Sequence, residues 1–323
     1  MRPNFVDARV RIGIAVCCAW VVAAASGPSA FAQFGIDYRL RSLNNGSTSY
    51  EFGTSEAPPA GWAPLSRLDF SLDSVWHGLS LKLEQPVWEV HVEWLTPIQD
   101  EMKGDLYDYD WLPPNSDSSF TDLGVMRERW ISGQMLDINL KVRVLDGMLG
   151  QPIQVLPLAG FRWQRFHVMA YDLVQLKEDN VWPSNPYTYS GDVIDFQQDY
   201  YSPYAGVQLR ALLTFWSALP TLLTLQFDAG YVAARNTDHH LIREGNRYTY
   251  ERTGGHSGRI AFVSELILSE NMSLGLELAH LSIDTTGTHQ LVNVPLGIDE
   301  TTDHGVRVWS DQSSLTAYFC LRI

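Results

Sequence analysis

An acidic pair in the first half of the chain has the spacing that acid–base chemistry requires. It lies within Asp108-Tyr109-Asp110-Trp111. Residues i and i+2 of an extended chain share one face, so both carboxyl groups can point the same way. Two carboxyl groups this close resist double ionisation and hold a proton or a water molecule between them. Taken alone, such a pair is more often a solvated acidic loop than a catalytic group.

Asp238-His239-His240 is a second group of this kind. A carboxylate beside an imidazole fixes the tautomer of the ring and raises its basicity. The polar face of the preceding stretch carries even-numbered residues, and the same parity continues to Asp238 and His240. These residues are Thr224, Gln226 and Asp228. We therefore expect Asp238 and His240 to point into an interior and His239 to face outward. A loop histidine is usually only a polar residue, so this pair alone also proves little.

Together the two groups indicate hydrolysis of an amide bond by water. On opposite walls of one cavity, they can hold a water molecule against a peptide carbonyl group. No serine or cysteine motif in the sequence requires another nucleophile. A metal site made of Asp108, Asp110 and His240 is an alternative, but no ligand-spacing motif supports it. We therefore expect neither a metal nor a cofactor.

The elements that must position these groups show a period of two. Apolar residues alternate with polar ones over 88–94, 135–145 and 272–279. Such alternation predicts strands with one apolar and one polar face. A soluble β-sandwich gives the same pattern. Aromatic residues near the strand ends, and a last alternating strand that ends with the chain, favour a membrane barrel instead.

Ten strands are predicted from this pattern, at 35–43, 63–72, 87–97, 131–145, 154–175, 194–212, 220–236, 258–268, 271–285 and 308–323. Long polar connections alternate with shorter ones, at 44–62, 98–130, 176–193, 237–257 and 286–307. We predict an all-β fold, a ten-stranded antiparallel transmembrane β-barrel with long extracellular loops. The acidic groups follow the third and seventh strands, so they should face each other across the extracellular mouth.

The first residues are typical of a signal peptide. Arg2, Arg9 and Arg11 precede an apolar run over 12–25, and Ala30-Phe31-Ala32 offers a cleavage site. The run is short for a spanning helix, which needs about 20 apolar residues. We therefore expect a signal peptide over 1–32 and a single outer-membrane barrel domain over 33–323. Cys320 is then the sole remaining cysteine, so no internal disulfide can form.

The charge of the chain excludes nucleic acid as a partner. The formal net charge is −14, and it becomes −16 without residues 1–32, which hold three Arg and one Asp. A chain this acidic repels a phosphate backbone. Nothing in the sequence predicts a partner subunit, and we expect a monomer.

The chain resembles the omptin family of outer-membrane endopeptidases. The resemblance covers most of the chain from about residue 64, and its motifs follow one another in order. They are Leu65-Ser66-Arg67-Leu68-Asp69-Phe70, Asp108-Tyr109-Asp110-Trp111, Phe120-Thr121-Asp122, Pro203-Tyr204-Ala205-Gly206-Val207, Asp238-His239-His240, and Asn271 with Leu274, Leu276 and Glu277. The resemblance implies a hydrolase, an aspartic-type endopeptidase. Its catalytic residues would be Asp108, Asp110, Asp238 and His240, with a water nucleophile.

The resemblance also implies binding residues. Substrate contacts would fall on Asn236, Asp122, Leu106 and Ile194, and protein or peptide chains would be the substrates. An acid occupies the position of Asn236 in family members that prefer basic residues, so cleavage after Arg or Lys is not expected here. Lipopolysaccharide would act as an activator through outer-wall cations, of which Arg165 matches one position and Asp199 replaces another.

Two rival functions fit the same fold. A catalytically inactive barrel of this kind could be an adhesin or receptor, because long surface loops bind partners without chemistry. A small porin is the other rival. Ten strands enclose a narrow lumen that side chains such as Asp137, Lys141, Arg210 and Glu277 would fill, so we expect poor conduction.

Overall fold

The computed structural model describes residues 33–53, 64–111, 119–148, 151–215, 219–245 and 247–323. The predicted signal peptide over 1–32 lies outside these residues. No helix in the described part of the chain is long and apolar enough to span a membrane.

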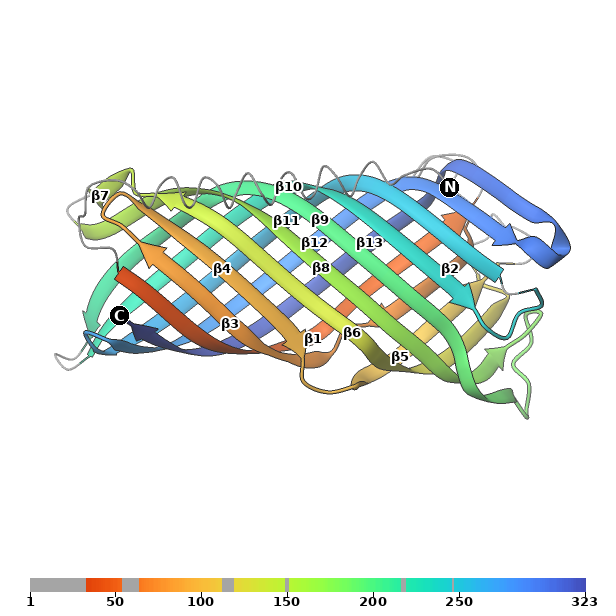
Figure 1. Ribbon diagram of the computed structural model, residues 1–323. Coiled ribbons are helices and arrows are strands. Elements are labelled where there is room, and N and C mark those ends of the chain that lie inside the picture. Colours follow the sequence, from red (N-terminus) through yellow and green to blue (C-terminus); the bar gives the residue numbers. More distant parts are fainter. Residues whose placement is uncertain (1–32, 54–63, 112–118, 149–150, 216–218, 246) are drawn as a thin grey trace.

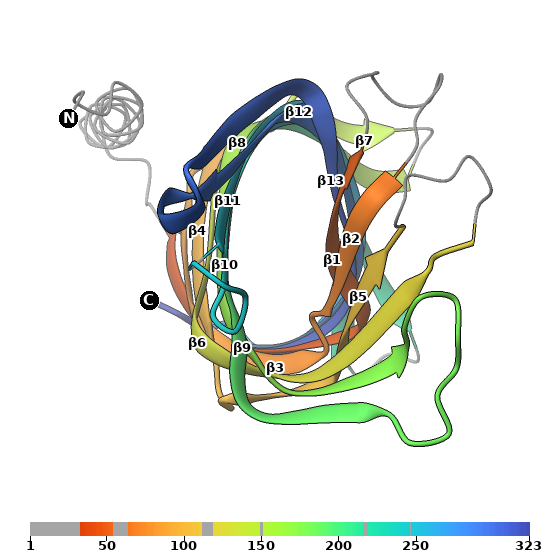
Figure 2. The ribbon, with the colours of Figure 1, turned by 90° about the vertical axis from the view of Figure 1, so that its right-hand side faces the viewer.

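The described residues form antiparallel strands and one short 3-10 turn, η1 (Val294–Leu296). The strands are β1 (Gln33–Gly53), β2 (Pro64–Ser71), β3 (Ser74–Glu84), β4 (Trp88–Pro97), β5 (Glu101–Asp110), β6 (Asp122–Val142), β7 (Leu145–Met148), β8 (Gln151–Lys177), β9 (Tyr187–Phe215), β10 (Leu219–His240), β11 (Arg247–Ser269), β12 (Met272–Asn293) and β13 (Ile298–Arg322). All pair into one sheet, which closes into an oval ring of strongly tilted strands (Figures 1 and 2).

The ring has ten strand positions, called staves below. Some staves consist of two described strands in succession, so the described strands are more numerous than the staves. β1 pairs with β13, and the sheet continues in reverse chain order to β8 and then β6. From β6 it returns to β1 by two routes, through β4 and β3 in one half of the barrel and through β5 and β2 in the other. β2 and β3 therefore form one interrupted stave, and β4 and β5 form another. The predicted ten-stranded antiparallel barrel is confirmed.

The interrupted staves correct two predicted connections. The segment 73–86 is mostly strand β3, and 98–130 contains β5 and the first part of β6. The exposed apolar Leu79 and Leu81 alternate with the buried Ser80, so β3 carried a readable strand pattern. β5 did not, because its outer face meets water rather than lipid and carries charged residues such as Glu101 and Lys103.

The other predicted outer loops are also shorter than expected. β8 runs to Lys177, β10 to His240 and β12 to Asn293, and the strands that follow begin within the predicted loops. In these extensions both strand faces carry polar residues, which hides the alternation from the sequence. The barrel is consequently taller than the apolar pattern alone predicts.

An exposed apolar belt surrounds one half of the barrel. Large apolar side chains point outward from neighbouring strands there, including Leu40, Leu79, Leu81, Leu140, Phe227, Ile260, Phe262, Leu274, Leu276, Leu278, Leu315 and Phe319. A continuous outward band of this kind faces lipid in transmembrane barrels. On β10 the exposed Tyr231 lies at the edge of the apolar belt that is nearer to His240, which is called the upper edge below. Asp238 follows about 20 Å further along the strand. The acidic groups therefore lie outside the bilayer.

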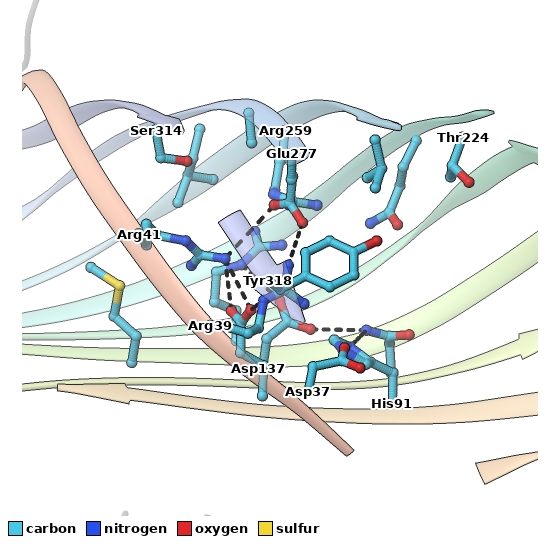
Figure 3. A pocket seen from close by; sticks show the side chains of 18 of the residues that line it. Asp37, Arg39, Arg41, His91, Asp137, Thr224, Arg259, Glu277, Ser314 and Tyr318 are labelled. Carbon is cyan, nitrogen blue, oxygen red and sulfur yellow. Dashed lines mark hydrogen bonds and ion pairs between the residues drawn. The ribbon is translucent and has the colours of Figure 1, made fainter. Parts of the chain in front are cut away.

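Inside the belt, the lumen holds a network of ion pairs (Figure 3). Arg39 Nε lies 2.9 Å from Glu93 Oε2, and Arg39 Nη2 lies 2.7 Å from Glu277 Oε2. Arg259 Nη2 contacts the other oxygen of Glu277 at 2.7 Å. Charges paired from several strands brace the wall from within, and they line a cavity of about 1120 Å³ in the lumen.

Above this network the interior is apolar. Trp76 packs edge-on against Trp130 with ring centroids 5.3 Å apart, and Phe70 stacks on Phe196 at 4.0 Å. The inward residues of β10 show the order of the layers. The charged Asp228 is followed by the apolar Val232 and Ala234, and these are followed by the polar Asn236 and Asp238. An apolar core thus separates the lumen from the acidic groups.

Candidate active site

Asp238 and His240 point inward from the end of β10, as the alternation predicts. β10 pairs with β11 from Thr221 to His240 without a register shift. The even-numbered residues therefore point inward along the whole paired length of the strand. His240 Nε2 lies 3.0 Å from Asp238 Oδ2. Both residues are buried. The intervening His239 faces outward and stacks on Tyr248 with ring centroids 3.9 Å apart.

Tyr50 supports this pair from β1, on another wall of the barrel. Its hydroxyl donates a hydrogen bond to Asp238 Oδ2, the same oxygen that His240 contacts. Burial and the charges of Asp238 and Glu251 raise the pKa of Tyr50 well above its ordinary value, so the phenol keeps its proton. Burial by itself would raise the pKa of Asp238, but His240 and Tyr50 outweigh it and hold that pKa below its usual value. Asp238 is therefore an ionised carboxylate although its side chain is 0% exposed.

Asp108 and Asp110 lie at the upper end of β5, where the sequence predicted a loop. Asp108 is held between Leu68 of β2 and Gly124 of β6 by strand pairing, so the segment is extended and both carboxyl groups face the same cleft. Burial, together with the neighbouring charge of Asp110, raises the pKa of Asp108 from 3.8 to about 7. A carboxyl group with such a pKa keeps a proton at mildly acidic pH.

Arg243 joins the acidic pair from the segment between β10 and β11. Its Nη2 lies 3.4 Å from Asp110 Oδ2 and 3.9 Å from Asp108 Oδ2. Burial would lower the pKa of Arg243, but these two carboxyl groups outweigh it and raise the pKa further. The guanidinium is therefore a permanent positive charge beside the pair.

One open cleft of about 550 Å³ brings the two groups together. Asp108, Asp110, His240 and Arg243 line it, while Asp238 lies behind His240. The described residues that complete the wall are Asp122, Gly124, Met126, Leu173, Gln175, Val193, Ile194 and Ile242. Three of the four predicted catalytic residues thus share this cleft, and the fourth contacts it through His240.

The predicted substrate-binding residues are placed unequally. Asp122 lines the cleft, and Ile194 forms part of its floor with almost no exposed surface. Leu106 is fully buried in the apolar core and does not line this cleft, and its contact with substrate stays a prediction. Asn236 is buried below Asp238, and neither its Oδ1 nor its Nδ2 has a hydrogen-bond partner among the described residues.

Arg165, the predicted lipid contact, is already engaged. Its Nε lies 2.8 Å from Asp199 Oδ1, and its Nη2 lies 3.1 Å from Asp199 Oδ2. Asp199, which by the resemblance stands at a basic position of the family, therefore pairs with Arg165. Lipid binding at Arg165 stays a prediction.

Sequence reasoning missed Tyr50, Arg243 and a second buried acid–imidazole pair. In that pair His289 Nδ1 lies 2.9 Å from Glu251 Oε1, one strand away from Asn236. Burial raises the pKa of Glu251. Within the described residues, no group of three or more His, Cys, Asp or Glu is arranged to hold a metal ion.

This arrangement suits general acid–base chemistry on a water molecule. With Nε2 of His240 donating to Asp238, the lone pair on Nδ1 is left to accept a proton. A protonated Asp108 can donate a hydrogen bond in the same cleft. A base and an acid are thus available in one cleft without a protein nucleophile.

Comparisons with known proteins agree with the fold. The Omptin family matches the chain over residues 61–303. Comparison with curated protein sequences gave no match.

Among solved structures, the outer membrane protease OmpT from Escherichia coli superposes with a TM-score of 0.77 at 16% identity, covering 90% of this chain and 97% of that one. This likeness shows a shared fold. The translocator domain of autotransporter NalP from Neisseria meningitidis gives a TM-score of 0.38 at 7% identity, covering 98% of each chain.

Proposed function

The chain belongs to the Omptin family, and from that membership and the cleft we propose that it is an outer-membrane endopeptidase. It hydrolyses peptide bonds of protein or peptide substrates at the cell surface, with the cleft on the extracellular side. The observation that carries the proposal is the shared cleft, in which His240, with Asp238 behind it, and the Asp108–Asp110 pair face one space.

His240 is the general base of the proposed reaction. It accepts a proton from a water molecule at Nδ1 while that water attacks the peptide carbonyl carbon. Asp238 stabilises the imidazolium that forms, and Tyr50 keeps Asp238 in position through its hydrogen bond. His240 then returns the proton to the leaving amine, so the base is regenerated with each cut.

Asp108 and Asp110 hold the water and stabilise the intermediate. The pKa of about 7 at Asp108 gives this pair a proton to donate near neutral pH. A donor held in place and aimed at the developing oxyanion lowers the barrier more than the same donor in water, and the Asp108 side chain is only 14% exposed. The roles of acid and base thus divide between the two walls of the cleft.

A peptide-library digest tests this function. Refolded wild-type protein should cut unstructured peptides, and Asp108→Ala and His240→Ala should each lose about 100-fold or more of that activity. His239→Ala is the matched control, because the same residue type one position away faces outward and stacks on Tyr248. Its activity should equal that of the wild type.

Two outcomes would reject the mechanism. Equal cleavage by wild type, Asp108→Ala and His240→Ala would show that another group does the chemistry. Cleavage by none of them, with folded barrels in each case, would favour the adhesin or receptor function. Activation by lipopolysaccharide and a monomeric state stay predictions, to be measured by adding the lipid to the same digest and by sizing the refolded protein.

A further inference from the structure

Arg243 is a cation on the wall of a cleft that also carries three aspartates. It is the only lysine or arginine among the described residues that line this space, beside the carboxyl groups of Asp108, Asp110 and Asp122. The Arg243 side chain is 40% exposed, whereas those of Asp108 and Asp110 are 14% and 18% exposed. A substrate that approaches from solvent therefore meets the guanidinium before it meets the carboxyl groups.

The guanidinium of Arg243 keeps binding capacity. Only Nη2 contacts the acidic pair, at 3.4 and 3.9 Å, and Nε and Nη1 have no partner among the described residues. These distances exceed the roughly 2.7–2.9 Å of a strong charge-assisted hydrogen bond. The contact with the pair is thus loose, and one edge of the guanidinium is available to another carboxylate.

The surrounding acids are partly neutralised or engaged. Asp122 Oδ2 accepts a hydrogen bond from Thr121 Oγ1 at 2.6 Å, and its Oδ1 accepts one from the backbone N of Asp179 at 3.1 Å. The raised pKa of Asp108 keeps it largely protonated below neutral pH. Asn236, which lies below the cleft, has an uncharged side chain. An incoming carboxylate therefore meets less repulsion than the residue types alone suggest.

We propose that Arg243 determines specificity by binding a carboxylate side chain of the substrate, so that peptides with Asp or Glu next to the scissile bond are preferred. The inference rests on the proposed function for its substrate class, a peptide. Arg forms paired hydrogen bonds with carboxylates, which gives direction as well as attraction.

Binding of matched peptides tests the inference without any cleavage. Fluorescent unstructured peptides differ at one position near the scissile bond, which carries Glu, Gln or Lys. They are titrated by anisotropy into refolded full-length protein with His240→Ala, which leaves them uncut. We expect the Glu peptide to bind about tenfold tighter than the Gln peptide at one position, and added salt to reduce this ratio.

Substitutions at Arg243 in the same background identify the cause. Arg243→Gln should bring the Glu-to-Gln ratio to about one, Arg243→Lys should keep a weaker preference for Glu, and Arg243→Glu should favour the Lys peptide. Arg127→Gln is the matched control, because Arg127 is exposed on the outer wall against Tyr171 and should leave the ratio unchanged. The ratio is an internal measure, so a change in the overall stability of a variant does not imitate the effect.

The outcomes separate this inference from the proposed function. Equal binding of the Glu and Gln peptides at every position, or an undiminished ratio in Arg243→Gln, would overturn it. The same peptides are also offered to protein with His240 intact. If none is cut while the Glu preference persists, the endopeptidase proposal fails and carboxylate recognition by Arg243 stands.

Discussion

Asp108→Asn should stabilise the barrel while it removes cleavage. The pKa of Asp108 rises from 3.8 to about 7 on folding, so above that pH the folded protein holds an ionised carboxylate in a site that resists ionisation. A difference of about three pH units, at about 1.4 kcal/mol each, corresponds to about 4 kcal/mol of lost stability. The amide of Asn has nearly the same shape and no charge to bury.

The pH dependence of the gain follows from the direction of the shift. A group with a raised folded pKa contributes stability below its unfolded pKa and loses that contribution as the pH rises toward the folded value. The wild type should therefore lose stability between about pH 4 and pH 7 through this residue. Asp108→Asn does not titrate there, so its advantage should be about 1–2 kcal/mol at pH 5 and approach about 4 kcal/mol at pH 8.

Urea unfolding in detergent micelles, followed by tryptophan fluorescence, measures this difference at both pH values. Asp122→Asn is the control, because both oxygens of Asp122 already accept hydrogen bonds and the substitution should bring no gain. An Asp108→Asn barrel that is less stable than the wild type at pH 8, or an advantage that does not change with pH, would refute the reasoning.

Three further predictions follow from contacts described above. Tyr50→Phe should lower kcat about tenfold with little change in KM, because Asp238 loses a charge-assisted hydrogen bond; an unchanged kcat in steady-state peptide assays would contradict the role of Tyr50. Cleavage rate should fall above about pH 7 as the raised pKa of Asp108 is passed and the proposed donor loses its proton, and a rate that stays level through this range would count against Asp108 as the donor. Arg39→Met should destabilise the barrel by about 3 kcal/mol in urea unfolding, because Glu93 and Glu277 lose a buried partner; an unaltered midpoint would show that the network is not needed.

The sequence predicted side-chain direction well where strands are regular. On β10 the even-numbered inward face persists from Thr224 to His240 because no bulge interrupts the pairing with β11. On β6 a register shift between Trp130 and Ser132 reverses the parity, so a pattern read below that point gives the wrong face above it. An odd or even residue number predicts the direction of a side chain only while strand pairing continues without a bulge. The pairing of β10 with β11 meets this condition.

Contacts between distant strands were not predictable from one sequence. Tyr50 reaches Asp238 across the barrel, from a strand that is not a neighbour of β10, so no local pattern links them. Arg243 lies beyond the end of β10, where the turn rather than the strand period sets its direction. The burial of Leu106 was not predictable either, because resemblance identifies a position along the chain but not the burial of its side chain.

The apolar core beneath the cleft has a consequence for turnover. If the chain cleaves peptides as proposed, that core blocks the way to the lumen, and both fragments must leave on the side from which the intact chain arrived. Release of the longer fragment would then compete with arrival of the next chain, and short fragments that retain contacts in the cleft would act as product inhibitors.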